Sequence, residues 1–571
     1  MRVQKSKTKN ATSYYIVEST YVQGKRSNKV VEKLGTLQEV IEKAGGMDPD
    51  EWAKQRAKEL TEEKKNNEVN RITIELLRSS ESDVITKNRF NCGYLFLEDI
   101  YYKLGLHRIC KDISKRYKYN YDLNEILSKL IYARMLLPSS KRSSYSYFEN
   151  LIEPTTFELE DIYRSLEVLA KECDFIQKEL YKNSSKVCER NTKVLYYDCT
   201  NYYFEIEEED DFRKYGASKE NRPNPIVQMG LFMDGNGLPL AFCINPGNTN
   251  EQVTMKPLEK SILKDFDISD FVVCTDAGLS STSNRKFNAI SNRSYIVTQS
   301  IKKTKAHIKE WCLDPNGWRE INSKNVFNIK EIDEDKYYDT IFYKERWINE
   351  NGLEQKLVVT YSVKYKEYMR SIREGQVNRA VKLVQRGANA LKRKNANDCR
   401  RFIESSNYTD DGIMAENTVI SIDEEAISKE AAYDGLYAVC TNLEATPEEL
   451  ISINRNRWEI EESFRIMKSE FKAKPVYLQR QDRIKAHFLI CFISLLILRI
   501  IEEQTEHKYT VKELLSTLQD MEVSLFKDIY IPSFNSDSIT NDLHKYVNFN
   551  LNKAFIPATE MRKILKDIKK Q

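Results

Sequence analysis

Two short apolar runs that each end in an aspartate constrain the fold of this chain more than any other feature. Residues 193–200 read KVLYYDCT and deliver Asp198, and residues 270–278 read DFVVCTDAG and deliver Asp276. Runs of this length, bounded by turn residues, are typical of buried strands. Further strand-like runs lie around them, namely NPIVQMGLFMD, LPLAFCI and SYIVTQS. Five strands with helices between and after them predict an α/β domain, whose strands present functional groups at their carboxyl ends.

The pattern changes on both sides of these strands. Residues 1–40 contain two β-rich runs on either side of a turn at residues 23–27, which predicts a hairpin. Residues 90–190 carry apolar residues at the three- and four-residue spacing of packed helices. Residues 302–445 are strand-rich, include a basic helix-like stretch at 364–401, and end in the strand-like run GLYAVCTN. We interpret this last region as an inserted subdomain.

The composition of the 571 residues excludes several classes of protein. With 41% hydrophobic and 31% charged residues, the chain is neither membrane-embedded nor wholly disordered. The most apolar stretch, residues 488–498, is much shorter than the roughly twenty residues of a membrane span, so we expect a buried helix there. The net charge is only +3, but residues 1–33 hold eight Lys or Arg against two acids, and residues 364–401 hold twelve against three. Such runs either attract phosphates or form solvated helix faces.

Cysteine and histidine usage bears on the compartment and on metal chemistry. The eleven cysteines include no CxxC pair and there are only five histidines, which leaves a zinc site without support. We expect reduced thiols in a cytoplasmic protein. Cys199 and Cys274 should be buried on the strand face opposite Asp198 and Asp276. Any metal ion would then have oxygen ligands.

A third acidic residue lies in TPEELISINRNRWEIEESFRIMKSEF, residues 446–471, which we predict to be one long helix beginning with a capping box. Four of its residues are spaced by four, three and four, and therefore share one helical face: Arg457, Glu461, Phe464 and Lys468. This places a carboxylate between two cations. The alternative interpretation is an exposed salt-bridge stripe, just as each aspartate taken singly could be a turn or cap residue.

Three carboxylates without a histidine or cysteine cluster suit a hard cation such as Mg²⁺, which binds carboxylates together with substrate phosphate oxygens. Two such ions about 4 Å apart activate a nucleophile and stabilise the leaving oxygen of an in-line displacement at phosphorus. We therefore hypothesise that Asp198, Asp276 and Glu461 are metal ligands. Arg457 and Lys468 would contact backbone phosphates beside the metal ions.

These residues resemble the three acidic motifs of insertion-sequence DDE transposases. YYDCTNYYFE, VVCTDAG and RWEIEESFRIMK are similar to the motifs of the group whose last signature is Tyr-x2-Arg-x3-Glu-x6-Lys. Asn454 stands where that signature has its tyrosine. The segments GASKENRPNP and GNTNE also resemble conserved segments of this group, and the first of them points to Lys219 and Arg222 as DNA-binding residues. The likeness covers residues 1 to about 500.

The resemblance implies an RNase H-like catalytic core, of α/β class, interrupted by a β-rich insertion and flanked by helical N- and C-terminal regions. The expected segments are an N-terminal β-hairpin region (1–45), a helical region binding DNA ends (46–190), the first part of the core (191–301), the insertion (302–445), the second part of the core (446–505) and a C-terminal helical region (506–571).

The resemblance also implies a reaction. A DNA transposase binds the terminal inverted repeats of its element, water frees a 3′ hydroxyl there, and that hydroxyl attacks target DNA, with a hairpin intermediate as a further option. The implied cofactor is Mg²⁺, for which Mn²⁺ substitutes. The implied partners are double-stranded DNA and a second copy of the chain in the DNA complex, with no membrane.

Two other functions remain open at this stage. The first is an RNase H-like nuclease that cleaves without strand transfer. The second is a catalytically silent, domesticated DNA-binding protein, which would bind DNA ends and show no cleavage in Mg²⁺ or Mn²⁺.

Overall fold

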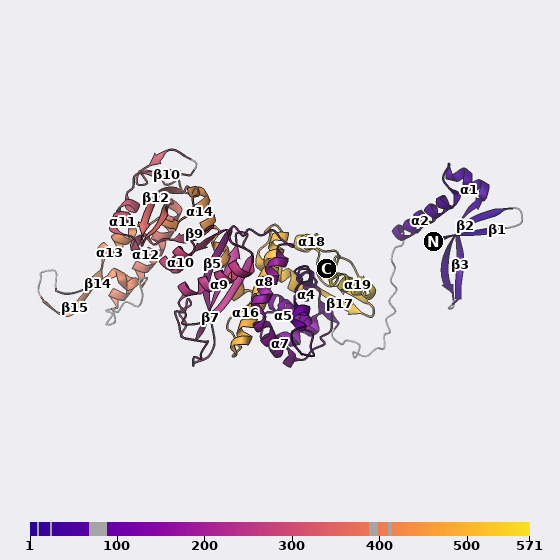
Figure 1. The fold of residues 1–571 in the computed structure, drawn as a ribbon, viewed down its shortest axis with the longest axis horizontal. Helices are drawn as coiled ribbons and strands as arrows, with labels where there is room; N and C mark the ends of the chain where they lie inside the picture. The colour runs from indigo at the N-terminus through magenta and orange to yellow at the C-terminus, as the bar shows by residue number, and fades with distance from the viewer. Residues whose placement is uncertain (8–10, 23–24, 68–87, 322, 387–397, 409–413) are drawn as a thin grey trace. The chain divides into compact units, whose positions relative to one another are not determined.

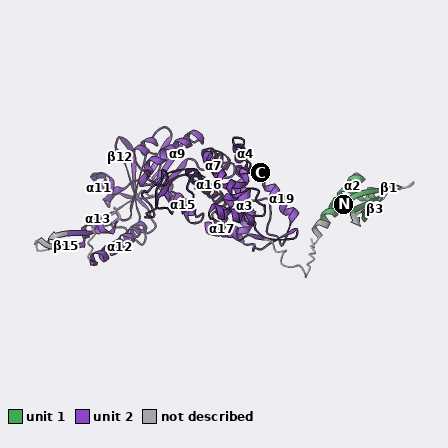
Figure 2. Ribbon diagram, turned by 90° about the horizontal axis from the view of Figure 1, so that it is seen from below, with its two compact units in different colours: residues 1–86 green, residues 87–571 purple. Residues whose placement is uncertain are grey.

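The structure is a computed structural model that describes residues 1–7, 11–22, 25–67, 88–321, 323–386, 398–408 and 414–571. The chain divides into two compact units, Met1–Thr86 and Lys87–Gln571, which are coloured separately in Figure 2.

The first unit is a small antiparallel sheet with two helices. Strands β1 (Arg2–Lys7), β2 (Thr12–Val22) and β3 (Lys25–Thr36) pair in that order, followed by α1 (Leu37–Ala44) and α2 (Pro49–Asn67). The predicted hairpin corresponds to β2 and β3, and residues 23–24 of its turn lie outside the described part of the chain. Apolar side chains from the sheet and both helices form its core, including Tyr14, Ile16, Leu34, Val40 and Ala57.

The second unit begins with the predicted helical layer. Its helices are α3 (Tyr94–Lys103), α4 (Leu106–Ser114), α5 (Leu123–Leu136), α6 (Lys141–Tyr147), α7 (Leu159–Lys171) and α8 (Cys173–Ser184). They pack around α16 (Gln481–Gln504), which contacts α5 and α7 and contains the apolar run 488–498. Within the described residues, α16 is the one helix long and apolar enough to cross a membrane, and 94% of its most apolar window is buried inside the protein. The prediction of a buried helix is confirmed.

The five predicted core strands form one continuous part of a larger sheet. They are β5 (Val194–Tyr203), β6 (Ile226–Asp234), β7 (Pro239–Pro246), β8 (Phe271–Thr275) and β9 (Arg293–Thr298), in the spatial order β7-β6-β5-β8-β9. The first three pair antiparallel, while β8 and β9 lie parallel to β5. Helices α9 (Glu251–Asp265) and α10 (Thr282–Phe287) connect them. This arrangement confirms the predicted α/β class with an RNase H-like core.

The strands of region 302–445 extend this same sheet. Strand β16 (Leu436–Thr441) pairs antiparallel with β9, and beyond it follow β13 (Leu353–Tyr361), β12 (Phe342–Glu350), β10 (Trp318–Glu320) and β11 (Val326–Phe327). The sheet therefore has ten strands, and the region continues the core sheet at its β9 edge (Figure 1). The remaining elements of the region are η4 (Ile301–Lys303), α11 (Ala306–Leu313), α12 (Val363–Gln385), η5 (Cys399–Phe402), β14 (Ile403–Tyr408), β15 (Met414–Ile422) and α13 (Glu424–Ala431). Residues 387–397 of the basic stretch lie outside the described part of the chain.

The prediction of one long helix over residues 446–471 is wrong, because the segment forms two helices. Helix α14 (Pro447–Arg455) begins with the predicted capping box of Thr446 and Glu449, and α15 (Trp458–Ser469) follows after a short turn. Around the turn the backbone N–H groups donate to carbonyls three residues earlier, as in Arg457 to Asn454 and Ile460 to Arg457. Such tighter bonds replace the α-helical ladder and interrupt the helix.

The C-terminal region adds a small sheet to its helices. After α17 (Val511–Asp520) come β17 (Glu522–Phe526), β18 (Ile529–Pro532), α18 (Ser538–His544), β19 (Ile556–Pro557) and α19 (Ala558–Ile568). Strand β17 pairs with β4 (Arg89–Asn91) from the beginning of the unit. The C-terminal region is thereby joined to the helical layer that precedes the core.

Candidate active site

Asp198 and Asp276 come from neighbouring parallel strands, but only Asp276 lies at a strand end. Asp276 directly follows β8, whereas β5 continues beyond Asp198 to Tyr203, so the prediction that Asp198 ends its strand is wrong. Strand β5 pairs with β8 as far as Tyr196 and Cys274, and each aspartate follows two residues further along its chain segment. Asp276 is close enough to act electrostatically on Asp198. Cys199 and Cys274 are both buried, as predicted. The predicted face is wrong for Cys274, because residues two apart on a strand point to the same side, and the two cysteines belong to different core clusters. Asp276 also caps a short turn, because its carboxylate accepts a hydrogen bond from the backbone N–H of Leu279 at 3.1 Å.

Helix α15 brings Glu461 to the same end of the sheet. The helix packs Ile460, Phe464 and Met467 into the core, and Met467 contacts the hydroxyl of Tyr202 on β5. Glu461 lies on the exposed side, where its carboxylate pairs with the Arg457 guanidinium at 2.9 Å. The predicted four-residue pairing is thus present across the turn that precedes α15.

One cavity of about 470 Å³ collects most of the predicted site residues. Its lining includes Asp198, Glu461, Lys468 and Lys219, together with Thr200, Arg465 and Lys474. Asp276 and Arg457 lie outside the lining, although both act electrostatically on Asp198. Arg222 is separate from the cavity, and its guanidinium lies 4.3 Å from the ring centre of Tyr203.

The pKa of Asp198 is raised to about 6, mainly because burial disfavours the charged carboxylate. Lys219 opposes this shift and the neighbouring Asp276 adds to it. A carboxylate whose pKa is raised by burial and by a second carboxylate is typical of a functional site.

Two of the three lysines that line the cavity, Lys219 and Lys468, are held by partners on other segments. Lys219 donates to the backbone carbonyl of Cys199 and pairs with Glu251 at 3.2 Å, so the GASKENRPNP and GNTNE segments meet here. Lys468 donates to the Thr200 hydroxyl at 2.7 Å and lies 3.6 Å from Glu220. Burial lowers the pKa of Lys468, whereas Asp198 and Glu251 outweigh the effect of burial on Lys219 and raise its pKa.

Sequence reasoning missed two members of this charge network, Glu220 and Lys474. Glu220 forms ion pairs with Lys474 and with Lys468. Neither residue belongs to a spacing pattern that would have indicated a role, apart from the position of Glu220 directly after Lys219. Their proximity depends on how the segment after α15 folds back onto the loop after β5.

Asn454 occupies the position of the signature tyrosine, and a tyrosine from another element contacts it. The Asn454 amide donates to the Tyr437 hydroxyl at 3.3 Å, and that hydroxyl also bonds the Thr298 hydroxyl at 2.6 Å. Burial lowers the pKa of Arg457, but Glu461 and then Tyr437 raise it, and the net shift is upward. A phenol from β16 therefore acts on Arg457 even though position 454 is Asn.

The three carboxylates could bind a hard cation together only if Glu461 first left its ion pair with Arg457. Asp198, Asp276 and Glu461 supply oxygen ligands alone, as Mg²⁺ and Mn²⁺ prefer. Within the described residues, however, no three His, Cys, Asp or Glu side chains are already gathered closely enough to hold a metal ion. Glu461 is engaged by Arg457. The third ligand would have to leave this ion pair to join the two aspartates.

Comparison with known proteins identifies the family. Residues 193–497, more than half of the chain, match the family model described as a transposase DDE domain. Among solved structures, the chain is similar to a piggyBac transposase in a synaptic complex with hairpin DNA, with 9% sequence identity and a TM-score of 0.35 over 84% of this chain and 83% of that chain. No curated protein matches. The family assignment depends on the sequence match alone, and by that match the chain belongs to the DDE transposases, enzymes that cleave and transfer DNA with a divalent metal ion.

Proposed function

We propose that this protein is the transposase of an insertion sequence, which binds terminal inverted repeats and catalyses Mg²⁺-dependent phosphodiester hydrolysis and strand transfer. The observation that carries the proposal is that Asp198 on β5 and Asp276, directly after the neighbouring parallel strand β8, interact electrostatically, with Glu461 lining the cavity that Asp198 also lines. We assign these three carboxylates as ligands of two metal ions. Mg²⁺ is the expected cofactor, and Mn²⁺ should substitute for it.

When bound, the metal ions would polarise the scissile phosphate and lower the pKa of the attacking water. The chain's own residues prepare this site. Arg457 holds Glu461 until a DNA phosphate competes for its guanidinium, because guanidinium binds phosphate as readily as carboxylate. Binding of DNA would then release Glu461 towards the two aspartates, which couples assembly of the metal site to the presence of substrate.

The cations of the cavity are suited to hold the DNA strand beside the carboxylates. Lys219 and Lys468 both line the cavity that contains Asp198 and Glu461. Their present partners, Glu251 and Glu220, would yield to phosphate oxygens. Arg222 is half-exposed outside the cavity, where it would contact the backbone further along the duplex. Two element ends must be held and cut together, so we propose a dimer in the DNA complex, acting in the cytoplasm.

An assay with labelled element-end DNA and unlabelled target DNA tests the proposal. The purified protein should nick the end at the element boundary in Mg²⁺ and then form joined products with the target. Nicks without joined products would instead support the nuclease without strand transfer. Binding of the ends with no cleavage in Mg²⁺ or Mn²⁺ would contradict the proposal in favour of a silent DNA-binding protein.

Metal binding is expected to weaken as the pH falls through about 6, the pKa of Asp198. A carboxyl group with this pKa is almost fully ionised at pH 7.5 and roughly one-tenth ionised at pH 5, and only the ionised form is a ligand. The affinity for Mn²⁺, measured by calorimetry, should therefore fall by about tenfold between these pH values. The Asp198→Asn variant should bind weakly at both. Equal affinity of the wild type at pH 5 and pH 7.5 would argue against Asp198 as a ligand.

A further inference from the structure

A second cavity, of about 320 Å³, lies beside the active-site cavity. Its walls come from α5, α6, α7 and α16 and from residues 472–478, which follow α15. The polar side chains in its lining include Arg134, Ser139, Ser140, Lys141 and His487, and no carboxylate is among the lining residues. Lys474 lines both cavities.

Lys141 is buried in this cavity without a partner. Lys141 is only 5% exposed, and among the described residues its ammonium group has no hydrogen-bond acceptor. An ammonium group removed from water without compensation is strongly unfavourable, so such groups are normally paired. Burial, and then the neighbouring Arg134, lower the pKa of Lys141 to about 7.

Arg134 adds a second buried cation to the cavity. It is 4% exposed and donates to the backbone carbonyls of Phe471 at 2.9 Å and Ser139 at 3.0 Å, while its Nε atom has no acceptor among the described residues. Both of its partners are neutral carbonyls, so its charge is not balanced. The pKa of His487 is well below its usual range because of burial and then these two cations, so this histidine is neutral.

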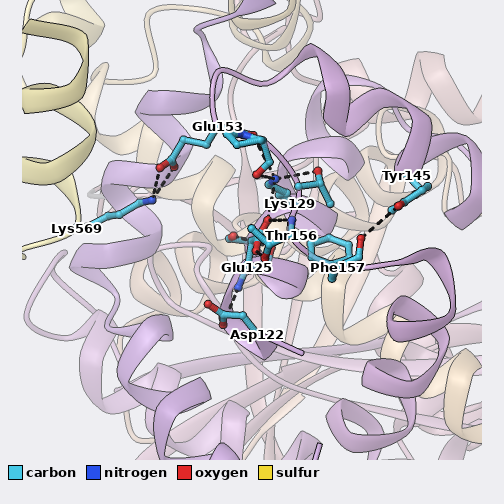
Figure 3. Close-up of polar contacts among 11 residues, drawn as sticks. Asp122, Glu125, Lys129, Tyr145, Glu153, Thr156, Phe157 and Lys569 are labelled. Carbon is cyan, nitrogen blue, oxygen red and sulfur yellow. Dashed lines mark hydrogen bonds and ion pairs between the residues drawn. The ribbon is translucent and has the colours of Figure 1, made fainter. Parts of the chain in front are cut away.

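A second buried lysine in the same helical layer shows how the chain treats a structural lysine. Lys129 on α5 is also 5% exposed, but it pairs with Glu125 at 2.9 Å and donates to Thr155 at 2.9 Å and to the carbonyls of Glu153 and Pro154. Figure 3 shows this cluster, in which Glu153 in turn pairs with Lys569. Lys141 has none of these partners, which indicates that its partner is an anion from outside the chain.

We propose that this cavity binds a phosphate group of the DNA strand that also occupies the active site. Phosphate supplies both the negative charge and the acceptor oxygens that Lys141 and Arg134 lack, and the hydroxyls of Ser139 and Ser140 are further donors in the lining. Lys474 lines both this cavity and the active-site cavity. A DNA strand whose scissile phosphate lies at Asp198 would therefore pass this second cavity with a neighbouring phosphate. The inference rests on the proposed function, because it assigns a non-scissile phosphate of the same substrate.

The Lys141→Met variant tests the inference through DNA affinity and its salt dependence. Loss of one charge-assisted contact should weaken binding of element-end DNA roughly 10- to 100-fold and reduce the slope of log K against log[salt] by about one. Lys566→Met on α19, which removes an exposed lysine, is the control for the loss of one charge and should change neither quantity. Both variants are measured in Ca²⁺, so that binding is separated from cleavage.

Thermal denaturation supplies a second readout. Lys141→Met removes an unpartnered buried charge and should not lower the melting temperature, whereas Lys129→Met leaves Glu125 without its ammonium partner and should lower it clearly. Inorganic phosphate should raise the melting temperature of the wild type and not that of Lys141→Met. If inorganic phosphate changed the melting temperatures of the wild type and of Lys141→Met equally, an anion site at Lys141 would be contradicted.

These experiments distinguish a phosphate of the DNA from free inorganic phosphate. They also separate failure of this inference from failure of the proposed transposase function. Protection by inorganic phosphate together with unchanged DNA affinity and salt slope in Lys141→Met would mean a free phosphate ligand, which overturns the assignment to DNA. Wild-type cleavage and wild-type DNA affinity in Lys141→Met would overturn this inference and leave the proposed function intact. A wild-type protein that binds no element-end DNA would overturn both.

Discussion

Replacing Glu461 with glutamine should reduce Mg²⁺-dependent cleavage of element ends by about a thousandfold or more. The substitution keeps the size of the side chain and removes the charge that would complete the metal site with Asp198 and Asp276. A metal ion contributes several kcal/mol to transition-state stabilisation, and about 4 kcal/mol corresponds to a factor of a thousand in rate. Cleavage of labelled end DNA is measured in single-turnover conditions, and end binding is measured in parallel.

The adjacent acid on the same helix provides a matched control. Glu462 pairs with Arg465 at 2.5 Å and is not in the lining of the active-site cavity. Glu462→Gln should therefore cleave at close to the wild-type rate. End binding should persist in both variants, because neither removes a cation. If Glu461→Gln cleaved as fast as Glu462→Gln, Glu461 would be an ordinary surface residue of α15 and its pairing with Arg457 a surface salt bridge.

Replacing Arg190 with methionine should destabilise the second unit by about 3–5 kcal/mol, the typical loss when one partner of a buried ion pair is removed. The Arg190 Nε atom lies 2.7 Å from the Asp234 carboxylate, and both side chains are almost completely buried. Arg190 also donates to the carbonyls of Leu238 and Pro239, so it holds the turn between β6 and β7. Burial already raises the pKa of Asp234, and Arg190 opposes that shift.

The loss should depend on pH and should be specific to the buried pair. Without Arg190 the pKa of Asp234 rises further, so its ionised form is disfavoured in the fold and the deficit grows as the pH increases. Urea denaturation at pH 6 and pH 8 measures it. The control is Lys193→Met, which breaks the exposed pair of Lys193 with Asp270 and should change stability by less than about 1 kcal/mol. Similar midpoints for the two variants would show that the buried pair contributes little.

Much of the core and two of its three acids could be predicted from local sequence. A short apolar run bounded by turn residues is typical of a buried strand, and this pattern located β5, which carries Asp198, and β8, which Asp276 directly follows. The capping box of Thr446 and Glu449 likewise depends on neighbouring residues only, and it is present. The buried helix over residues 488–498 follows from its apolar composition.

The prediction of secondary structure failed where contacts with distant segments, not the local sequence, decide the conformation. Residues 446–471 have the composition of one helix, yet the chain turns between α14 and α15. Residues around this turn contact distant elements: Asn454 bonds Tyr437 of β16, and Ile460 is buried in the core. The DNA-binding role predicted for Arg222 stays a prediction, and the structure places this residue outside the cavity.

By itself the sequence determined the α/β class, the strands that lead to Asp198 and Asp276, and the helical spacing of Glu461 and Lys468. Each of these features depends on residues that are close together in the sequence. Only the tertiary structure decided that the strands of region 302–445 continue the core sheet, that Glu220 joins Lys474 to Lys468, and that Lys141 is buried without a partner. These features depend on contacts between segments far apart in the chain. The physical reason is that burial and strand pairing between distant segments are set by the packing of the whole unit, which no local pattern records.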